Sequence, residues 1–292
     1  MFKSFTVKFA VALAIGLAAA VLIAPPAAVL VARAGFRIPF PRIFDRVVMA
    51  ALFGVILCAA RGLRLLETLR AGFHESRGAL TRGLRGFAVA IAVMTLLYAA
   101  AFALGGANNV AGAGAIYRVA KYLAAAIAIG ILEEAFFRAF LFGAMRTDFR
   151  RSGALAASSA IYAAAHLVRS PARFYVTGLD WTAGLRTLAG SIAQFAHPWT
   201  ALPTLLGLFL LGIVLAQAYV ITGSVYFSIG LHSGFVLGAK LWPKLIANRA
   251  ILPGWLAGWG HQPIISGPAA WLAALAILAA LPKLTGGRAR GS

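Results

Sequence analysis

Residues 124–145, AAAIAIGILEEAFFRAFLFGAM, form an apolar run that nevertheless holds three charged side chains. A helix needs about 20 mostly apolar residues to cross a bilayer, so this run is long enough to span one. Each charge at the centre of a membrane helix costs about 2.5 to 3.5 kcal/mol. Glu133, Glu134 and Arg138 would together cost about 7 to 10 kcal/mol in contact with lipid. The sequence therefore predicts a membrane helix whose charges have a function.

The composition of the whole chain also indicates a membrane protein. Of its 292 residues, 62% are hydrophobic and 12% are charged, whereas soluble domains have about 25% charged residues. Lysine and arginine number 27 against 7 acidic residues, a formal charge of +20. The basic residues punctuate apolar runs, as they do at lipid headgroups, and form no basic stripe of the kind that binds nucleic acid. We expect the lipid bilayer as a partner, and no nucleic acid.

Runs of spanning length recur along the chain, bounded by Arg, Pro, Gly or Asn. They lie at residues 9–31, 42–60, 87–105, 117–145, 153–168, 200–221, 224–242 and 268–281. The expected fold is an all-α, polytopic transmembrane helical bundle of about eight spans. The second run has a short apolar part, which leaves a re-entrant or interfacial segment open. A single cysteine, Cys58, excludes an internal disulfide.

The connection at residues 61–86 is long and basic. Its Leu and Arg residues recur at helical spacing, which is typical of an amphipathic helix at the membrane surface or of a solvated basic loop. Cytoplasmic loops are richer in Lys and Arg than loops on the other side of a membrane. This connection therefore favours a topology in which it lies in the cytoplasm together with the N-terminus.

Helical geometry separates the three charges of the quoted run. At about 100° per residue, Arg138 lies about 40° around the helix from Glu134 but about 140° from Glu133. Glu134 and Arg138 are therefore expected to pair, which leaves Glu133 on another face, where it suits a general base for water. The alternative is that all three charges form an ion-pair cluster that locks helices together.

Two of the five histidines fall inside other apolar runs. His166 and His232 each follow small and hydroxyl-bearing residues at helical spacing, which predicts a polar stripe on each helix. Counted at about 1.5 Å per residue from the ends of their helices, Glu133 lies about 20 Å deep, His166 about 22 Å and His232 about 12 Å, so all three can meet near mid-bilayer. A carboxylate and two imidazoles at one depth can bind a divalent metal such as zinc, with Glu133, His166 and His232 as ligands, or activate water without a metal. Both schemes remain open.

These residues also resemble a known family. EEAFFR at residues 133–138 is similar to the EExxxR motif of the CPBP intramembrane proteases, which include CAAX prenyl proteases and bacteriocin-processing enzymes. YAAAH at 162–166 is similar to their FxxxH motif, and FLLG at 209–212 to their third motif. GSVYFSIGLHSGFV at 223–236 resembles the fourth, in which a His begins an HxxxN or HxxxD pattern.

The resemblance implies hydrolysis of a peptide bond within the membrane. It implies that Glu133 and His166 activate the water, while His232 binds metal or stabilises the oxyanion. Val236 stands where the family has Asn or Asp, so one hydrogen-bond donor is missing from the oxyanion site, although water or Ser228 could replace it. Glu134 and Arg138 complete the candidate site.

We therefore expect an intramembrane endopeptidase of the bacterial cytoplasmic membrane, acting on a membrane-associated protein or peptide. The expected regions are N-terminal membrane helices with the basic connection at 1–116, the catalytic helical core at 117–245, and a C-terminal membrane helix with a basic tail at 246–292. Two alternatives are a catalytically silent scaffold, suggested by Val236, and a proton-coupled transporter, because intramembrane Glu and His also form proton relays. Motifs of other intramembrane proteases, such as HExxH, are absent from the sequence.

Overall fold

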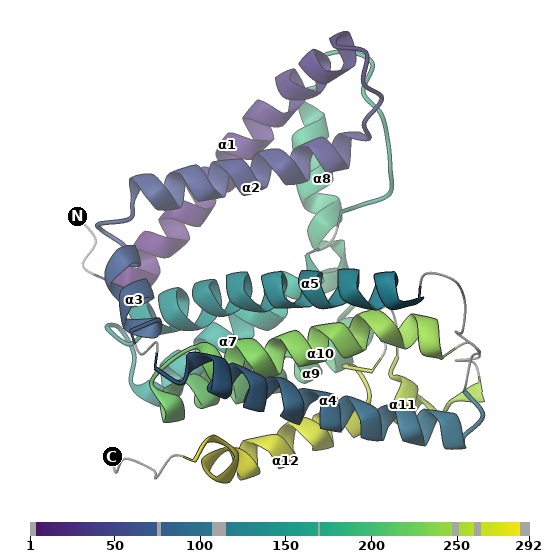
Figure 1. The fold of residues 1–292 in the computed structure, drawn as a ribbon. Coiled ribbons are helices and arrows are strands. Elements are labelled where there is room, and N and C mark those ends of the chain that lie inside the picture. Colours follow the sequence, from purple (N-terminus) through teal and green to yellow (C-terminus); the bar gives the residue numbers. More distant parts are fainter. Residues whose placement is uncertain are drawn as a thin grey trace. The chain divides into compact units, whose positions relative to one another are not determined.

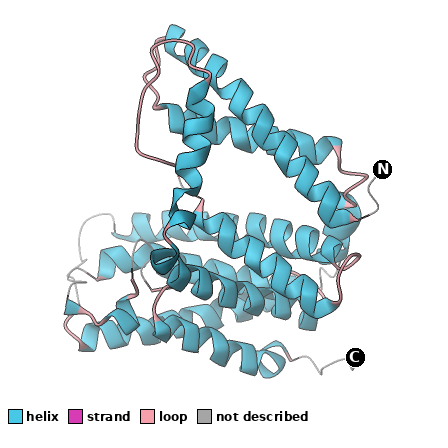
Figure 2. Ribbon diagram, turned by 180° about the vertical axis from the view of Figure 1, so that it is seen from behind, coloured by secondary structure: helices cyan, strands magenta, loops and turns pink. Residues whose placement is uncertain are grey.

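The computed structural model of the chain describes residues 4–74, 77–106, 115–168, 170–246, 251–259 and 264–286 (Figure 1). The regular elements in these ranges are all helices, as Figure 2 shows, which confirms the predicted all-α class. Contacts between Cα atoms group the chain into two compact units. Unit 1 comprises Met1–Leu66 and Ala164–Ala201, and unit 2 comprises Glu67–Ala163 and Leu202–Ser292. The predicted division at residues 116 and 245 stays a prediction.

Unit 1 is built around a helical hairpin. Helices α1 (Phe5–Arg33) and α2 (Phe40–Cys58) pack along each other, and both contact α8 (Thr182–Ile192), which is followed by the short 3-10 helix η2 (Ala193–Ala196). Small residues on α1 let α2 approach, and the aromatic side chains of α2 fill the space between them. The buried side chains of this core are Ala20, Ala24, Ala28, Phe40, Ile43, Phe44 and Ala183.

The ends of these helices follow local sequence signals. The Ser4 hydroxyl accepts a hydrogen bond from the backbone N–H of Val7 at the start of α1. Before α8, the Asp180 carboxylate accepts hydrogen bonds from the backbone N–H and hydroxyl of Thr182 and pairs with Arg186. The Thr182 hydroxyl first, and Arg186 in addition, hold the pKa of the Asp180 carboxyl below its usual value.

Unit 2 has α10 (Tyr226–Leu245) packed along both α4 (Ala79–Ala103) and α5 (Ala115–Glu134), as Figure 1 shows. Glycine makes both approaches possible. A Cβ atom at Gly230 of α10 would overlap the carbonyl oxygen of Gly83 on α4. A Cβ atom at Gly130 of α5 would overlap the hydroxyl of Ser233 on α10. The second approach brings the end of α5, with its two glutamates, against α10.

Unit 2 also contains α7 (Arg151–Leu167), α9 (Pro198–Thr222), α11 (Gly254–Ala257) and α12 (Pro268–Thr285). The first residues of α9 and the last of α7 count with unit 1. Helices α4, α9, α10 and α12 share an apolar core. Its buried members are Ala90, Val214, Leu215, Ala218, Phe227, Leu231, Ala274, Ile277 and Leu281.

All eight predicted apolar runs lie on helices. Among the residues that the structure describes, four helices are long and apolar enough to cross a membrane: α1, α4, α9 and α12. The runs at 42–60, 117–145, 153–168 and 224–242 lie on helices that are shorter, less apolar or more charged. The chain is an integral membrane protein with a helical bundle.

The basic connection at 61–86 is largely helical. It contains α3 (Leu65–Gly72) and the first turns of α4, which begins at Ala79 instead of near the predicted residue 87. The early start has a physical reason, since Arg82 lies against the ring of Tyr226, with Cζ 5.7 Å from the ring centroid. Arginine can pack its stem and guanidinium on an apolar surface, so it does not end the helix.

Candidate active site

The charged run of the sequence does not form one regular helix. We predicted a single helix over residues 117–145, but α5 ends at Glu134 and is followed by the π-helix η1 (Ala135–Phe142) and the short α6 (Gly143–Met145). In a π-helix each hydrogen bond reaches five residues along the chain, so the turn is wider than an α-turn. Such turns occur often at functional sites. The change of helix type falls immediately after the two glutamates.

Glu134 is the centre of a buried network. Its Oε1 atom lies 3.1 Å from Nη1 of Arg138 and 2.9 Å from Nδ1 of His232. All three side chains are almost completely excluded from solvent. The pairing of Glu134 with Arg138 is thus confirmed, and α10 adds an imidazole to the same oxygen.

Arg138 is enclosed by aromatic rings and a carbonyl group. Its Cζ atom lies 4.5 Å from the ring centroid of Tyr162 on α7 and 5.8 Å from that of Phe137. Its Nη2 donates a long hydrogen bond of 3.5 Å to the carbonyl oxygen of Gly212 on α9. The guanidinium therefore connects η1 to both α7 and α9.

Glu133 differs from its neighbour in exposure. Its side chain is 28% exposed, and its Oε2 atom lies 3.7 Å from Nε2 of His232. Spacing along the helix predicted that Arg138 does not neutralise Glu133. The separation of Glu133 and His232 agrees with their predicted proximity, whereas the contact of His232 with Glu134 was not predicted. The imidazole of His232 is thus flanked by two carboxylates, with Nδ1 toward Glu134 and Nε2 toward Glu133.

His166 lies one helical turn after Tyr162 on α7, and its side chain is half-buried. The boundary between the units falls at Ala164, so His166 counts with unit 1 while the Glu134 network belongs to unit 2. The convergence of His166 with Glu133 and His232 stays a prediction. Among the described residues, no three His, Cys, Asp or Glu side chains are grouped so that they could hold a metal.

The Glu133 carboxylate and the His232 imidazole are groups that can bind zinc. Zinc binds His nitrogen and carboxylate oxygen at about 2.0 to 2.2 Å in a tetrahedron, so two ligands of one ion lie roughly 3.3 Å apart. The 3.7 Å between Glu133 and His232 is close to that separation. The contact of Nδ1 with Glu134 also matches the carboxylate that usually orients a zinc-binding histidine. These residues fit two positions of a zinc site, and a third ligand is still needed.

Three serines lie near the network: Ser159 belongs to the polar stripe predicted before His166, Ser228 was considered as a donor, and Ser233 was not singled out from the sequence. The hydroxyls of Ser159 and Ser233 are buried and have no hydrogen-bond partner among the described residues. Each lies where a glycine, Gly212 or Gly130, allows two helices to approach. Ser228, considered as a substitute donor, instead donates to the carbonyl oxygen of Val225 at 2.9 Å. The helical spacing of hydroxyl residues before His166 and His232 was the sequence signal for Ser159 and Ser228, whereas Ser233 directly follows His232 and lies outside that spacing.

Comparison with known proteins agrees with the motifs. Residues 115–238 match the family model described as type II CAAX prenyl endopeptidase Rce1-like. The match contains Glu133, Glu134, Arg138, His166 and His232. No curated protein and no solved structure matches the chain.

Proposed function

We propose that this chain, as a CAAX-protease-family protein with an Rce1-like segment at residues 115–238, hydrolyses a peptide bond of a membrane-associated protein or peptide. The family match supports an intramembrane CAAX-type endopeptidase. The mechanism and the substrate are our proposal. The observation that carries the proposal is the position of His232 between a buried and a partly exposed carboxylate.

In the proposed reaction, Glu133 is the general base. A water molecule near Oε2 of Glu133 attacks the carbonyl carbon of the peptide bond and gives its proton to that carboxylate. The carbonyl oxygen becomes an oxyanion, which His232 stabilises through a proton on Nε2. When the intermediate collapses, the C–N bond breaks and the proton passes from Glu133 to the leaving amine. His166 is proposed to assist in activating the water.

Glu134 and Arg138 are proposed to position His232. An ionised carboxylate only accepts hydrogen bonds, so the contact at Oε1 of Glu134 requires a proton on Nδ1 of His232. Because the oxyanion requires a second proton on Nε2, His232 is proposed to act as the imidazolium. Arg138 compensates the charge of Glu134, which would otherwise be buried without an opposite charge. The two residues thereby fix the direction in which Nε2 points.

A zinc ion is the alternative means of activating water. Glu133, His166 and His232 would hold the ion, and its chemistry would be that of a Lewis acid that lowers the pKa of water and polarises the substrate carbonyl. Glu134 would then orient His232 as a ligand by the same hydrogen bond. Zinc analysis of the purified protein and of its His232→Ala variant separates this scheme from the metal-free one.

A catalytically silent scaffold is the second candidate function, and Val236 is the observation that favours it. Valine cannot donate the hydrogen bond expected from Asn or Asp at this position, and loss of one oxyanion donor costs about 2.7 to 4 kcal/mol in other hydrolases. We propose that His232 and ordered water suffice. We also propose the bacterial cytoplasmic membrane as the location, on the basis of composition.

A cleavage assay in proteoliposomes tests the proposal. The probes are two quenched fluorescent peptides, one prenylated at a CAAX cysteine and one anchored by an acyl chain. We expect Glu133→Gln to lower kcat at least 100-fold, because general-base catalysis contributes about 10² to 10⁴ in rate. Helix content should not change. The control, Glu67→Gln on α3, makes the same change outside the network and should cleave like the wild type. Equal cleavage by Glu133→Gln would exclude the proposed base.

A further inference from the structure

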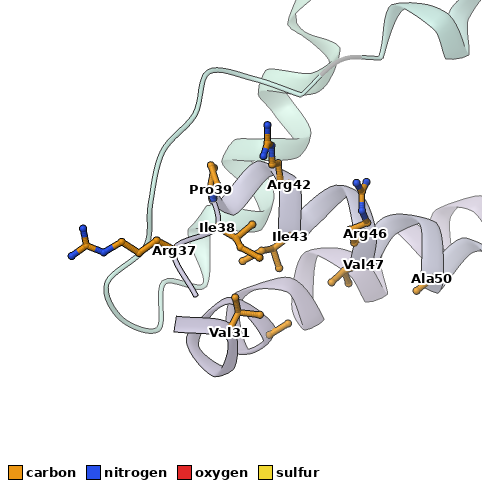
Figure 3. A pocket seen from close by; sticks show the side chains of 10 residues that line it. Val31, Arg37, Ile38, Pro39, Arg42, Ile43, Arg46, Val47 and Ala50 are labelled. Carbon is orange, nitrogen blue, oxygen red and sulfur yellow. The ribbon is translucent and has the colours of Figure 1, made fainter. Parts of the chain in front are cut away.

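The loop between α1 and α2 closes one end of a groove in unit 1. Helix α1 ends at Arg33, α2 begins at Phe40, and the two pack along each other as a hairpin. Between their ends lies a cavity of about 560 Å³, which is within the usual range of about 300 to 1,000 Å³ for small-ligand sites (Figure 3). A second cavity, of about 690 Å³, shares Val31, Arg37, Ile38 and Ile43 with it.

Apolar side chains and positively charged side chains both line this α1–α2 groove. Apolar side chains from both helices, among them Val31, Val47 and Ala50, line its length. Its charged lining residues are Arg37, Arg42 and Arg46, and no acidic residue lines it. Figure 3 shows Arg42 and Arg46 projecting from the same face of α2. The groove is therefore apolar with an excess of positive charge.

The acidic residue of this helix is engaged elsewhere. Asp45 lies between Arg42 and Arg46 in the sequence, but its carboxylate accepts a hydrogen bond from the hydroxyl of Ser170. It does not line the groove. The positive charge of the three arginines is thus available to an anion from outside the protein.

The charges and the apolar wall lie at different depths. Helix α1 is long and apolar enough to span a membrane, and Val31 is two residues from its end, where hydrocarbon meets the headgroups. Arg42 lies near the start of α2, whereas Ala50 is eight residues further along, about 12 Å at 1.5 Å per residue. Exposed aromatic residues at the same end, Phe36 and Tyr175, are typical of the headgroup layer.

We propose that the α1–α2 groove binds an anionic phospholipid. Its phosphate lies at Arg42 and Arg46, and an acyl chain follows the apolar wall toward Ala50. Charge complementarity excludes a zwitterionic lipid as the preferred occupant, and the depth of the wall favours a lipid over a free phosphate. This inference does not depend on the proposed protease activity.

Native mass spectrometry of the purified full chain with phosphatidylglycerol and phosphatidylcholine of equal chain length tests the inference. We expect the wild type to retain phosphatidylglycerol preferentially. Arg42→Gln/Arg46→Gln should weaken its binding roughly 25-fold, because each basic residue near an anionic surface contributes about fivefold in affinity. Ala50→Trp should also weaken binding, since it fills the groove without changing the charge.

The control Arg118→Gln/Lys121→Gln removes the same charge from exposed positions of unit 2. It should leave lipid binding unchanged, and an equal loss would overturn the proposal by showing non-specific attraction. Competition by glycerol phosphate at equal concentration would also overturn it, because the acyl chain would then be unnecessary. A dimer that dissociates in Arg42→Gln/Arg46→Gln would assign the groove to a second copy instead. Helix content by circular dichroism verifies that each variant is folded.

Discussion

Glu133 and Glu134 adjoin each other in the sequence, but their side chains have different surroundings. The Glu134 side chain is fully buried and shares one oxygen with Arg138 and His232, whereas that of Glu133 is 28% exposed. A charge with two buried partners is stabilised in its ionised form and held in place. A partly exposed carboxylate can receive a proton from water. The proposed division of roles between positioning and catalysis follows from this difference.

Tyr162 supports the network through its ring, which lies 4.5 Å from Cζ of Arg138. A desolvated cation–π contact contributes about 2 kcal/mol. We expect Tyr162→Leu to lower the free energy of unfolding by about 2 kcal/mol more than Tyr162→Phe, which keeps an aromatic ring at this position. Unfolding in SDS, followed by circular dichroism, measures the difference. Equal losses in the two variants would show that the ring does not stabilise Arg138.

For the helix that carries the glutamates, the sequence pattern predicted some features and not others. Apolar length predicted a helix here, and the spacing of Glu134 and Arg138 predicted their pairing. The π-helix η1 could not be predicted, because its residues AFFRAFLF are nearly all apolar and give no periodicity that separates a wide turn from an α-turn. The contact of His232 with both glutamates depends on how α10 packs on α5. The residue pattern within one helix does not determine that packing.

The packing of α4 on α10 depends on Gly230. A Cβ atom there would overlap the Gly83 carbonyl oxygen and lie 2.9 Å from the backbone nitrogen of Phe87, and backbone cannot move aside as a side chain can. We expect Gly230→Ala to lower the free energy of unfolding by about 1 to 3 kcal/mol, the usual cost of overpacking. It should also lower activity, because His232 lies two residues further along α10.

Gly83→Ala is the matched control for this prediction. It adds the same methyl group to the same pair of helices, but its Cβ atom would meet only the Tyr226 carbonyl oxygen at 3.6 Å, an ordinary contact. Alanine also has a higher helix propensity than glycine by about 1 kcal/mol. Gly83→Ala should therefore be as stable as the wild type or more stable. Similar unfolding curves for Gly230→Ala and Gly83→Ala would contradict the prediction. They would mean that α4 and α10 can move apart without loss of stability.

At the scale of the whole molecule, the sequence predicted the all-α class of the fold, and the number of spans stays a prediction. Apolar runs located all the long helices, because burial in lipid requires continuous hydrophobic length. The chain nevertheless forms two units that each combine distant segments, since 164–201 packs with the N-terminal hairpin. Helix α2 is the helix for which the sequence predicts a membrane crossing least strongly, because Arg42, Asp45 and Arg46 occupy its first turns.

Cysteine labelling tests whether α2 crosses the membrane. In a Cys58→Ser background, which removes the only native cysteine, single cysteines replace Phe36 in the α1–α2 loop or Arg77 in the basic connection. We expect a membrane-impermeant maleimide to label Phe36→Cys in intact bacterial cells, and Arg77→Cys only after the membrane is opened, because basic loops stay in the cytoplasm. Labelling of both positions from one side would mean that α2 lies along the membrane surface. A reversed pattern would put the N-terminus outside the cytoplasm, contrary to the predicted topology.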